Sequence, residues 1–452
     1  MSTSIRPVRS LLWCAGTILL ACSTGAFAAD PGPRPKTGSE GGHLANMTTN
    51  EIAFFNRGQE AFVDSETLAD GLGPRFNLDS CSGCHSQPAV GGTAPATNPQ
   101  VAVATAFGMR NILPSFITAN GPVREARFKQ TPTGTPDGGV HSLFVITFRD
   151  DGSLSAGVNN TCNIAQEDFA SQVANNNVSL RIPTPTFGLG LIEAIPDSSI
   201  LTNLTIGATT KQSLGIGGRV NVNGNDGRVA RFGWKAQNPS PLVFSAEAYN
   251  VEMGISNEGF PIEREERAGC GFKQVPNDTT NFDAATGLET VSDVEKFSFF
   301  MRFLAPPTPS DTSPGGAVSI AAGRNTFISV GCQFCHTQTL STGNAASAAL
   351  RNQQVNLFSD LALHHMGPGL ADNISQGVAA GDEFRTAPLW GLGQRIFLLH
   401  DGRTSNLTQA ILAHRSNANG VFRASEANAV TNNFAALSAT DQQNLLNYLR
   451  SL

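Results

Sequence analysis

The pentapeptide Cys-x-x-Cys-His occurs twice in this 452-residue chain, at residues 81–85 and again at 332–336. In this pattern two thiols add across the vinyl groups of a haem, and the adjacent histidine becomes an axial ligand of the iron. Zinc ribbons also use Cys-x-x-Cys knuckles, but they place the two knuckles about 15–20 residues apart and need no histidine after them. We therefore predict two covalently bound haem c groups. The residues that would hold them are Cys81, Cys84, His85, Cys332, Cys335 and His336.

The amino-terminal residues have the pattern of a secretory signal peptide. Arg6 and Arg9 precede an apolar run at 11–21, and Ala-Phe-Ala-Ala at 26–29 offers a small-residue cleavage site. The run is too short to span a bilayer. We predict a signal peptide at 1–28 and a periplasmic protein without a transmembrane segment, in agreement with haem attachment on the exported side of a bacterial membrane.

The cysteines outside the two motifs leave two questions open. Leu-Leu-Ala-Cys at 19–22 resembles a lipoprotein cleavage box, so the alternative to simple cleavage is a protein anchored through an acylated Cys22. Cys162 and Cys270 would remain in the mature chain. In an oxidising compartment we expect them to form a structural disulfide, although the sequence does not show whether they come close enough.

The composition excludes some classes of function. The net charge is −6, and no basic patch points to nucleic acid as a partner. With 46 Gly, 25 Pro and 15% charged residues, the chain is expected to be rich in loops, with haem contacts organising much of its core. Its length suggests two or three domains.

The chain also contains an internal duplication. A Gly-x-x-x-Phe pair precedes each haem motif, at 58–62 and at 323–327. A Pro-x-aromatic-Gly-Leu-Gly turn follows each motif at some distance, at 185–190 and at 388–393. Repetition of this kind predicts that one cytochrome c unit is used twice.

The predicted fold is therefore mainly α, with two cytochrome c-type haem domains at 45–300 and 315–452. The first carries a large, loop-rich insertion at about 110–180, which contains a strand in the alternating segment 141–148. A Pro-rich linker at 305–309 separates the two domains.

Capping signals place two of the helices. Thr48 and Glu51 can form a capping box before the first haem motif. Ser438, with Asp441 at the third position, can begin a final helix that has leucines along one face. Such a helix commonly closes a cytochrome c fold against its amino-terminal helix.

Most of the mature chain resembles a family of bacterial di-haem oxidoreductases of the peroxidase type. The stretches that carry the resemblance are 73–77 (Gly-Pro-Arg-Phe-Asn), 187–196, 231–236 (Arg-Phe-Gly-Trp-Lys-Ala), 252–255 (Glu-Met-Gly-Ile), 365–370 and 384–414. More distantly, the haem-bearing parts are similar to di-haem cytochrome c peroxidases and to the enzyme that matures methylamine dehydrogenase. The resemblance implies one haem for peroxide chemistry and a second that supplies or stores electrons.

The resemblance also implies a sixth ligand for the second haem. His-Asp-Gly-Arg at 400–403 is similar to a turn in the peroxidases, whose ligand follows that histidine by fourteen residues; here the position is His414. We interpret the second haem as bis-histidine, although His414 could instead be a surface residue. The competing ligands are His364, His365 and Met366.

Glu252 is the candidate acid/base for the first haem. It lies in Val-Glu-Met-Gly at 251–254, which resembles the segment that places a glutamate over the open haem face in the peroxidases. Splitting peroxide requires a proton to move from the inner to the outer oxygen, which a carboxyl group within hydrogen-bond reach can do. The alternative is a structural carboxylate. Glu193 is the second candidate, and Glu125, flanked by arginines, is expected in an ion pair.

Three further predictions concern the surroundings of the haems. Trp234 stands where the peroxidases have a tryptophan between the haems, so it is the candidate electron relay; the alternative is an aromatic core residue. Arg385 and Arg403 could pair with haem propionates or form surface ion pairs. The resemblance also makes a calcium ion between the domains possible, bound by backbone carbonyls at 395 and 397.

Three functions remain open from the sequence. The first is a periplasmic di-haem peroxidase or peroxide-driven oxidase, which takes electrons from an unknown redox protein or small-molecule donor. The second is an electron-transfer cytochrome without chemistry of its own. The third is a haem dioxygenase that acts on an organic substrate. Reaction with peroxide, and the coordination state of the first iron, would discriminate among them.

Overall fold

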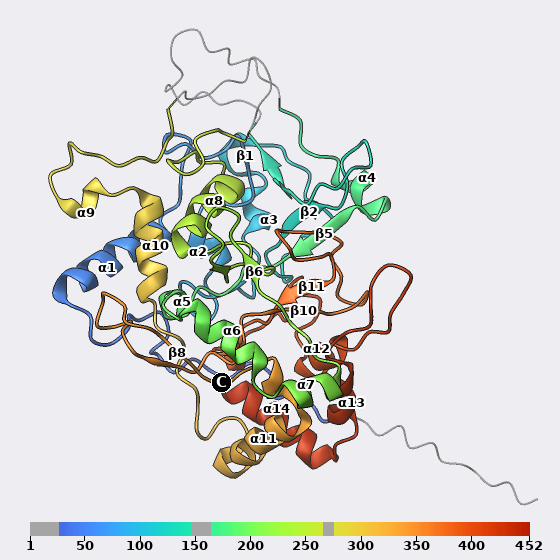
Figure 1. The fold of residues 1–452 in the computed structure, drawn as a ribbon. Coiled ribbons are helices and arrows are strands. Elements are labelled where there is room, and N and C mark those ends of the chain that lie inside the picture. Colours follow the sequence, from blue (N-terminus) through green and yellow to red (C-terminus); the bar gives the residue numbers. More distant parts are fainter. Residues whose placement is uncertain (1–26, 147–163, 265–274) are drawn as a thin grey trace, which may run out of the picture.

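The computed structural model describes residues 27–146, 164–264 and 275–452 (Figure 1). Its α-helices are α1 (Thr49–Val63), α2 (Cys81–Cys84), α3 (Gln100–Val103), α4 (Phe169–Ala174), α5 (Leu189–Glu193), α6 (Asp197–Thr205), α7 (Ala208–Leu214), α8 (Pro241–Met253), α9 (Gly287–Thr290), α10 (Asp293–Phe303), α11 (Gly316–Val330), α12 (Leu407–Ala413), α13 (Asn428–Ala435) and α14 (Ala439–Ser451). Short 3-10 helices are η1 (Ala106–Gly108), η2 (Cys332–Phe334) and η3 (Leu392–Gln394). The strands are β1 (Arg75–Phe76), β2 (Glu125–Phe128), β3 (Val140–His141), β4 (Phe144–Val145), β5 (Val178–Arg181), β6 (Asn221–Val222), β7 (Val229–Ala230), β8 (Leu340–Ser341), β9 (Gln354–Val355), β10 (Leu363–His365) and β11 (Glu383–Arg385).

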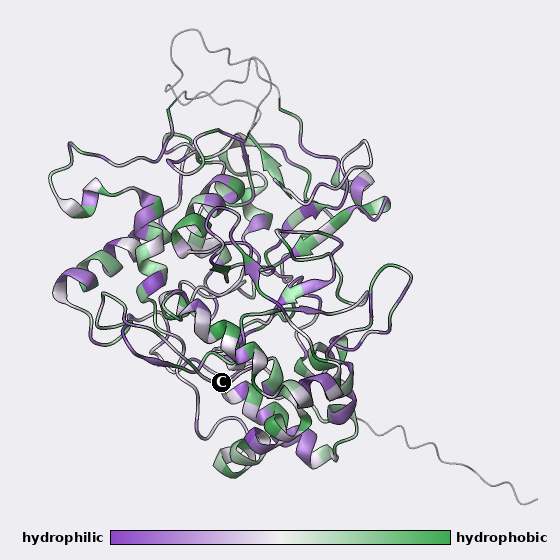
Figure 2. Cartoon of the chain, in the orientation of Figure 1, coloured by the Kyte–Doolittle hydropathy of each residue, from purple (hydrophilic) through white to green (hydrophobic). Residues whose placement is uncertain are grey.

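Helices make up 32% of the described residues, so the expected mainly helical fold is confirmed only in part. Long loops and small sheets connect the helices (Figure 1). Figure 2 shows both hydrophobic and hydrophilic residues along most helices, as expected for helices with one buried face. Among the described residues, no helix has both the length and the apolar character needed to cross a membrane.

The first half is organised by the crossing of α1 and α10. Both helices begin with a capping box, Thr48 with Glu51 and Ser292 with Glu295, as the sequence predicts for the first of them. At the crossing, a Cβ atom on Gly58 would overlap the backbone carbonyl of Lys296. The absent side chain therefore allows the two helices to approach closely.

The second half repeats this crossing with α11 and α14, at the bottom of Figure 1. A Cβ atom on Gly323 would overlap the carbonyl of Asn444 and lie 2.7 Å from the Cβ of Tyr448. One turn later, Phe327 meets the Tyr448 ring edge-on, with the centroids 5.7 Å apart. The side chain of Ser438 caps α14 by accepting from the backbone N–H of Asp441, as predicted.

The two Gly-Leu-Gly turns dock on these helix pairs in matching positions. A Cβ on Gly190 would overlap the carbonyl of Arg302 in α10, and a Cβ on Gly393 would overlap that of Arg450 in α14. The preceding glycines of the two turns have φ values of 67° and 71°, in the left-handed region that glycine adopts readily. The sequence repeat thus corresponds to a structural repeat, although the domain limits themselves remain a prediction.

A three-stranded antiparallel sheet, in the order β3-β2-β5, belongs to the region predicted as an insertion. It pairs Ala126 with His141 and Arg127 with Ser179. The predicted strand at 141–148 is found as two short strands, β3 and β4, which pair with β2 and β1 respectively. The sheet matters for the site because β2 and β5 present charged side chains toward the first haem motif.

Residues 27–44, which we call the amino-terminal strap, join the two halves. Asp30 forms a buried ion pair with Arg450 of α14, at 2.7 Å between Oδ2 and Nη2. Further along, the N–H of Leu44 donates to the carbonyl of Phe303 at the end of α10. Residues 1–26, Cys162 and Cys270 lie outside the described residues, so the leader, the lipoprotein alternative and the disulfide remain predictions.

Candidate functional site

The first Cys-x-x-Cys-His motif lines a cavity of about 150 Å³, which we call the first cavity. Ser80 caps α2 by accepting from the N–H of Gly83, and this short helix turns Cys81 and Cys84 toward the cavity. His85 follows directly, and its Nδ1–H donates to the carbonyl of Gly92 at 3.0 Å. A carbonyl oxygen only accepts, so Nδ1 carries the hydrogen in this bond; the backbone of Thr184 also lies close to the ring.

The second motif lines a larger, mostly apolar cavity of about 230 Å³, which we call the second cavity. His336 Nδ1 donates to the carbonyl of Phe358 at 3.0 Å. His414, at the end of α12, lines the same cavity, and its Nδ1 donates to the carbonyl of Ala410 at 2.7 Å. Both histidines therefore present Nε2 as an acceptor, the arrangement that a pair of axial ligands requires. His414 is partly buried, with its side chain on the wall of the second cavity, and its role as a ligand stays a prediction.

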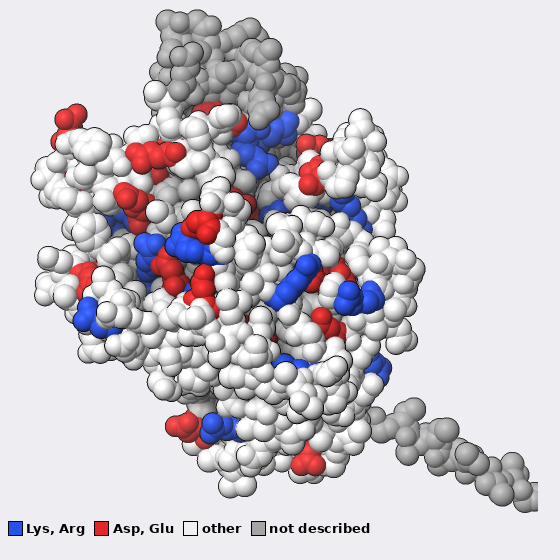
Figure 3. Space-filling model, in the orientation of Figure 1, with Lys and Arg blue, Asp and Glu red and all other residues white. Residues whose placement is uncertain are grey.

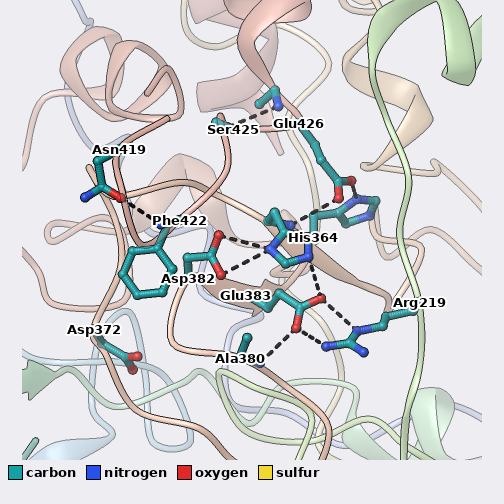
Figure 4. A network of polar contacts seen from close by, with 12 residues as sticks. Arg219, His364, Asp372, Ala380, Asp382, Glu383, Asn419, Phe422, Ser425 and Glu426 are labelled. Carbon is teal, nitrogen blue, oxygen red and sulfur yellow. Dashed lines mark hydrogen bonds and ion pairs between the residues drawn. The ribbon is translucent and has the colours of Figure 1, made fainter. Parts of the chain in front are cut away.

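Two of the competing ligands have both ring nitrogens engaged, and Figure 4 shows one of these contacts, between His364 and Glu426. His364 binds Asp360 at 2.9 Å and Glu426 at 2.7 Å. His365 binds Asp382 at 3.0 Å and Glu383 at 3.2 Å. Met366 lines the second cavity and remains a competitor of His414.

Glu252, near the end of α8, lines the first cavity. Its Oε2 accepts from the amide of Asn77 at 2.6 Å, and the carboxyl group of Glu125 lines the same cavity. Burial, and then the negative charge of Glu125, raise the pKa of Glu252 to about 8. At neutral pH this carboxyl group is therefore mostly protonated.

Glu125 forms the predicted ion pair, at 2.6 Å from the Nε of Arg127, but the pair lies inside the first cavity. The sequence did not identify its contact with Glu252, because more than one hundred residues separate the two. Asn77 was also missed as a partner of Glu252, although it stands in the 73–77 stretch that carried the family resemblance.

Glu193 lies outside the first cavity. Both of its carboxylate oxygens accept from Arg302 of α10, at 2.7 and 2.9 Å. This bidentate ion pair joins α5 to α10, so Glu193 holds two helices together.

Trp234 lines both cavities, together with Ile182 and Pro183. Its Nε1–H donates to the carbonyl of Ile182 at 2.9 Å, and its ring meets that of His400 edge-on at 6.3 Å. An aromatic side chain thus forms part of the wall between the two motifs.

The residues of the second cavity fit a haem. Arg385 and Arg395 line it, and neither has an ion-pair partner within the described part of the chain. Burial and the neighbouring Arg395 lower the pKa of Arg385 to about 10, and burial alone lowers that of Arg395 to about 10. Two buried cations beside paired thiols and histidines suit a cofactor that carries two carboxylates. Arg403 instead forms a surface pair with Asp401 at 2.7 Å.

The calcium prediction gains nothing from side chains, since the described residues contain no cluster of three or more His, Cys, Asp or Glu suited to a metal ion. One of the two expected carbonyls, that of Arg395, accepts from Arg450 at 2.9 Å.

A family profile described as "Di-haem oxidoreductase, putative peroxidase" matches residues 124–452. The chain belongs to this family. The match includes the second Cys-x-x-Cys-His motif and begins after the first. Membership in this family implies haem as the cofactor of this di-haem oxidoreductase.

Solved structures similar to this di-haem oxidoreductase include hydrazine synthase from Kuenenia stuttgartiensis, pressurised with xenon, at 17% identity and a TM-score of 0.24. The diheme peroxidase BthA from Burkholderia thailandensis E264 matches at 15% and 0.25. A MauG-like protein associated with microbial copper homeostasis matches at 16% and 0.28. The matches cover 37%, 36% and 60% of this chain. They span 56%, 51% and 89% of those chains, so the first two are matched over about half their length. No curated protein matches the chain.

Proposed function

We propose that this di-haem oxidoreductase reacts with peroxide at the first cavity, reducing it or using it to drive an oxidation, with electrons arriving from the second cavity. The observation that supports this assignment is a buried, largely protonated carboxyl group, that of Glu252, in the cavity lined by the first haem motif.

In the proposal, Cys81 and Cys84 hold one haem c covalently and His85 is its axial ligand. The second haem c would be held by Cys332 and Cys335, with His336 and His414 as its ligands; Met366 is the alternative to His414. A haem iron with an open position supplies a binding site for peroxide and accepts the oxidising equivalents released when the O–O bond breaks.

The protein side chains control the protons. Peroxide in the first cavity must lose a proton from its inner oxygen and gain one on its outer oxygen. Asn77 donates to Glu252 and so fixes the orientation of its carboxyl group. Arg127 keeps a positive charge close by without ion-pairing to Glu252 itself, since its Nε binds Glu125.

Trp234 is the proposed contact between the cavities. Its ring lines both of them, and its hydrogen bond to Ile182 fixes it in place. We also propose export to the periplasm, with a signal peptide at 1–28; a lipid-modified Cys22 in the mature protein would contradict simple cleavage.

The test compares Glu252→Gln with Glu193→Gln, the same isosteric change outside the cavity. Glu252→Gln should keep both haems by pyridine haemochrome assay and slow the reaction with peroxide by about 10²–10⁴-fold in stopped-flow spectra. Glu193→Gln should react at the wild-type rate. The reverse result would move the acid/base to Glu193.

A second comparison separates the proton step from electron delivery. Trp234→Phe should leave the first reaction with peroxide unchanged and slow the following change in the spectrum of the second haem. A wild-type protein that never reacts with peroxide would favour the electron-transfer cytochrome, and dioxygen uptake with an organic substrate would favour the dioxygenase.

A further inference from the structure

Two carboxyl groups face each other in the first cavity. Glu125 comes from β2 and Glu252 from the end of α8, and both side chains line this cavity, close enough for each carboxyl group to act on the other. An ionised carboxylate only accepts hydrogen bonds, so two carboxyl groups can bond to each other only when one holds a proton. Two carboxyl groups held close together in one buried cavity do not both ionise readily, so the pair favours a state with a single proton.

The surroundings decide which member holds the proton. Glu125 accepts from Arg127 at 2.6 Å, and Arg181 of β5 adds a second nearby positive charge. Burial works against ionisation of Glu125, but these two cations lower its pKa below the usual value. The direct partner of Glu252 besides Glu125 is the neutral amide of Asn77. The negative charge thus lies on Glu125 and the proton on Glu252.

Other charged groups lie near the two carboxyl groups but do not change which of them holds the proton. Arg264 lies within electrostatic range of both carboxyl groups and donates to the carbonyl of Val140 at 2.5 Å. Arg75 of β1 acts on Arg264. Glu247, on α8, acts on Arg127 and accepts from Asn238 at 2.6 Å, outside the cavity.

We propose that Glu125 is the positioning partner of Glu252 and the end point of a two-carboxyl proton relay. This proposal rests on the proposed reaction with peroxide. An O–H bond of peroxide breaks as one forms on the Glu252 oxygen that does not carry the proton, and the existing O–H bond of Glu252 breaks as one forms on Glu125. The pair then holds two protons, and no electrons have moved. Reversal of the relay delivers one proton to the outer oxygen, and the O–O bond breaks with its electron pair on that oxygen, which leaves as water. The two electrons that the inner oxygen then lacks would come from the haem, and the carboxyl pair returns to its single proton.

The relay and a single base predict opposite pH behaviour. If Glu252 acts alone, the wild-type rate should fall as the pH drops below about 8, where Glu252 becomes protonated. If Glu125 accepts the proton through Glu252, the rate should stay level through pH 8. It should then fall only at the lower pH where Glu125 itself is protonated.

Glu125→Gln sharpens this distinction. The variant removes the relay end point, so the remaining base is Glu252. Under the relay, the acid limb of the peroxide rate profile moves to higher pH than in the wild type. Under the single-base mechanism it moves to lower pH, because the charge that kept Glu252 protonated is gone. Glu247→Gln, which removes a negative charge near Arg127 outside the cavity, should leave the profile unchanged.

Infrared spectroscopy of the haem-loaded protein gives a readout independent of peroxide. Comparing wild type with Glu252→Gln isolates the carbonyl band of the protonated Glu252 carboxyl, and that band should disappear near pH 8. In Glu125→Gln the same band should disappear about one to three pH units lower, the usual effect of removing a like charge. An unchanged midpoint would overturn the shared proton.

The outcomes separate the relay from the proposed function. A wild-type rate that falls below pH 8 overturns the relay and keeps the peroxide reaction. This arm needs no variant, so it holds even if Glu125→Gln fails to fold. A wild type that does not react with peroxide overturns both, whatever the infrared result.

Discussion

The crossing of α11 and α14 makes Gly323→Ala a sensitive test of the repeated architecture. The added Cβ would overlap the carbonyl oxygen of Asn444 and lie 2.5 Å from its carbon, about 0.9 Å short of ordinary contact, which begins at 3.4 Å. Both contacts are with backbone, so a side-chain rotation cannot relieve them. The helices must separate, and overpacking of this kind costs about 1–3 kcal/mol. Part of that cost is offset, because alanine favours helix over glycine by about 1 kcal/mol.

The expected net loss is thus up to about 2 kcal/mol, which corresponds to a fall of up to about 8 °C in melting temperature for a unit of this size. Circular dichroism of the haem-loaded protein would measure it, with Gly287→Ala as the matched control. Gly287 begins α9 and has no atom within 4 Å of its would-be Cβ, so that variant should melt no lower than the wild type. Gly323→Ala more stable than the wild type by about 1 kcal/mol, the helix preference of alanine alone, would refute the close crossing.

Three further predictions follow from other contacts. Asp372→Asn should destabilise the protein by about 3–5 kcal/mol in denaturant titrations, because it leaves Arg181 and Lys235, which bind Asp372 at 2.6 and 3.0 Å, buried without their anion. Burial raises the pKa of Glu66 to about 7, so wild-type stability should fall between about pH 4.5 and 7 as the native state gives up its extra proton. Glu66→Gln should remove up to about 3 kcal/mol of that fall; an identical pH dependence in the two proteins would contradict it. His414→Ala should convert a low-spin ferric spectrum of the second haem to high-spin with covalent attachment intact, and an unchanged spectrum would transfer the ligand role to Met366.

Local sequence signals predicted the repeated parts of the fold. The capping box at Thr48 depends on residues three positions apart on one helix, so the sequence alone reveals it. The glycines at 58 and 323 each stand at a helix crossing, and their repeated Gly-x-x-x-Phe spacing is also visible in the sequence. The strands were harder to predict from the sequence, because β2 pairs with β5 some fifty residues away and no short-range alternation marks that pairing. The predicted single strand at 141–148 is divided between two partners for the same reason.

The candidate site shows the same contrast between local sequence signals, which predicted residues well, and tertiary contacts, which the sequence did not reveal. Residues inside a recognisable motif, such as His414 and Glu252, were found at the cavities. Glu125 was assigned correctly to an ion pair, but its second contact depends on a tertiary approach that neither glutamate signals alone. Glu193 follows a conspicuous turn, yet its side chain points to Arg302, a direction that depends on the packing of α5 against α10.

The surface agrees with the sparse charge of the sequence. On the face drawn in Figure 3, acidic and basic side chains are interspersed among uncharged residues. Many of the charges described above are instead buried between elements, where Arg181, Lys235 and Asp372 are at most 2% exposed.

The amino-terminal strap has a consequence for electron transfer. It is held to α14 through Asp30 and Arg450 and to the end of α10 through Leu44, so one stretch of backbone spans both helix pairs. Electron tunnelling slows steeply as donor and acceptor move apart, so two redox centres on separately moving halves would exchange electrons at fluctuating rates. A backbone segment anchored at both ends limits the relative motion of the two halves and favours a constant distance between the two redox centres. Cutting the strap should therefore broaden the distribution of inter-centre electron-transfer rates before it unfolds either half.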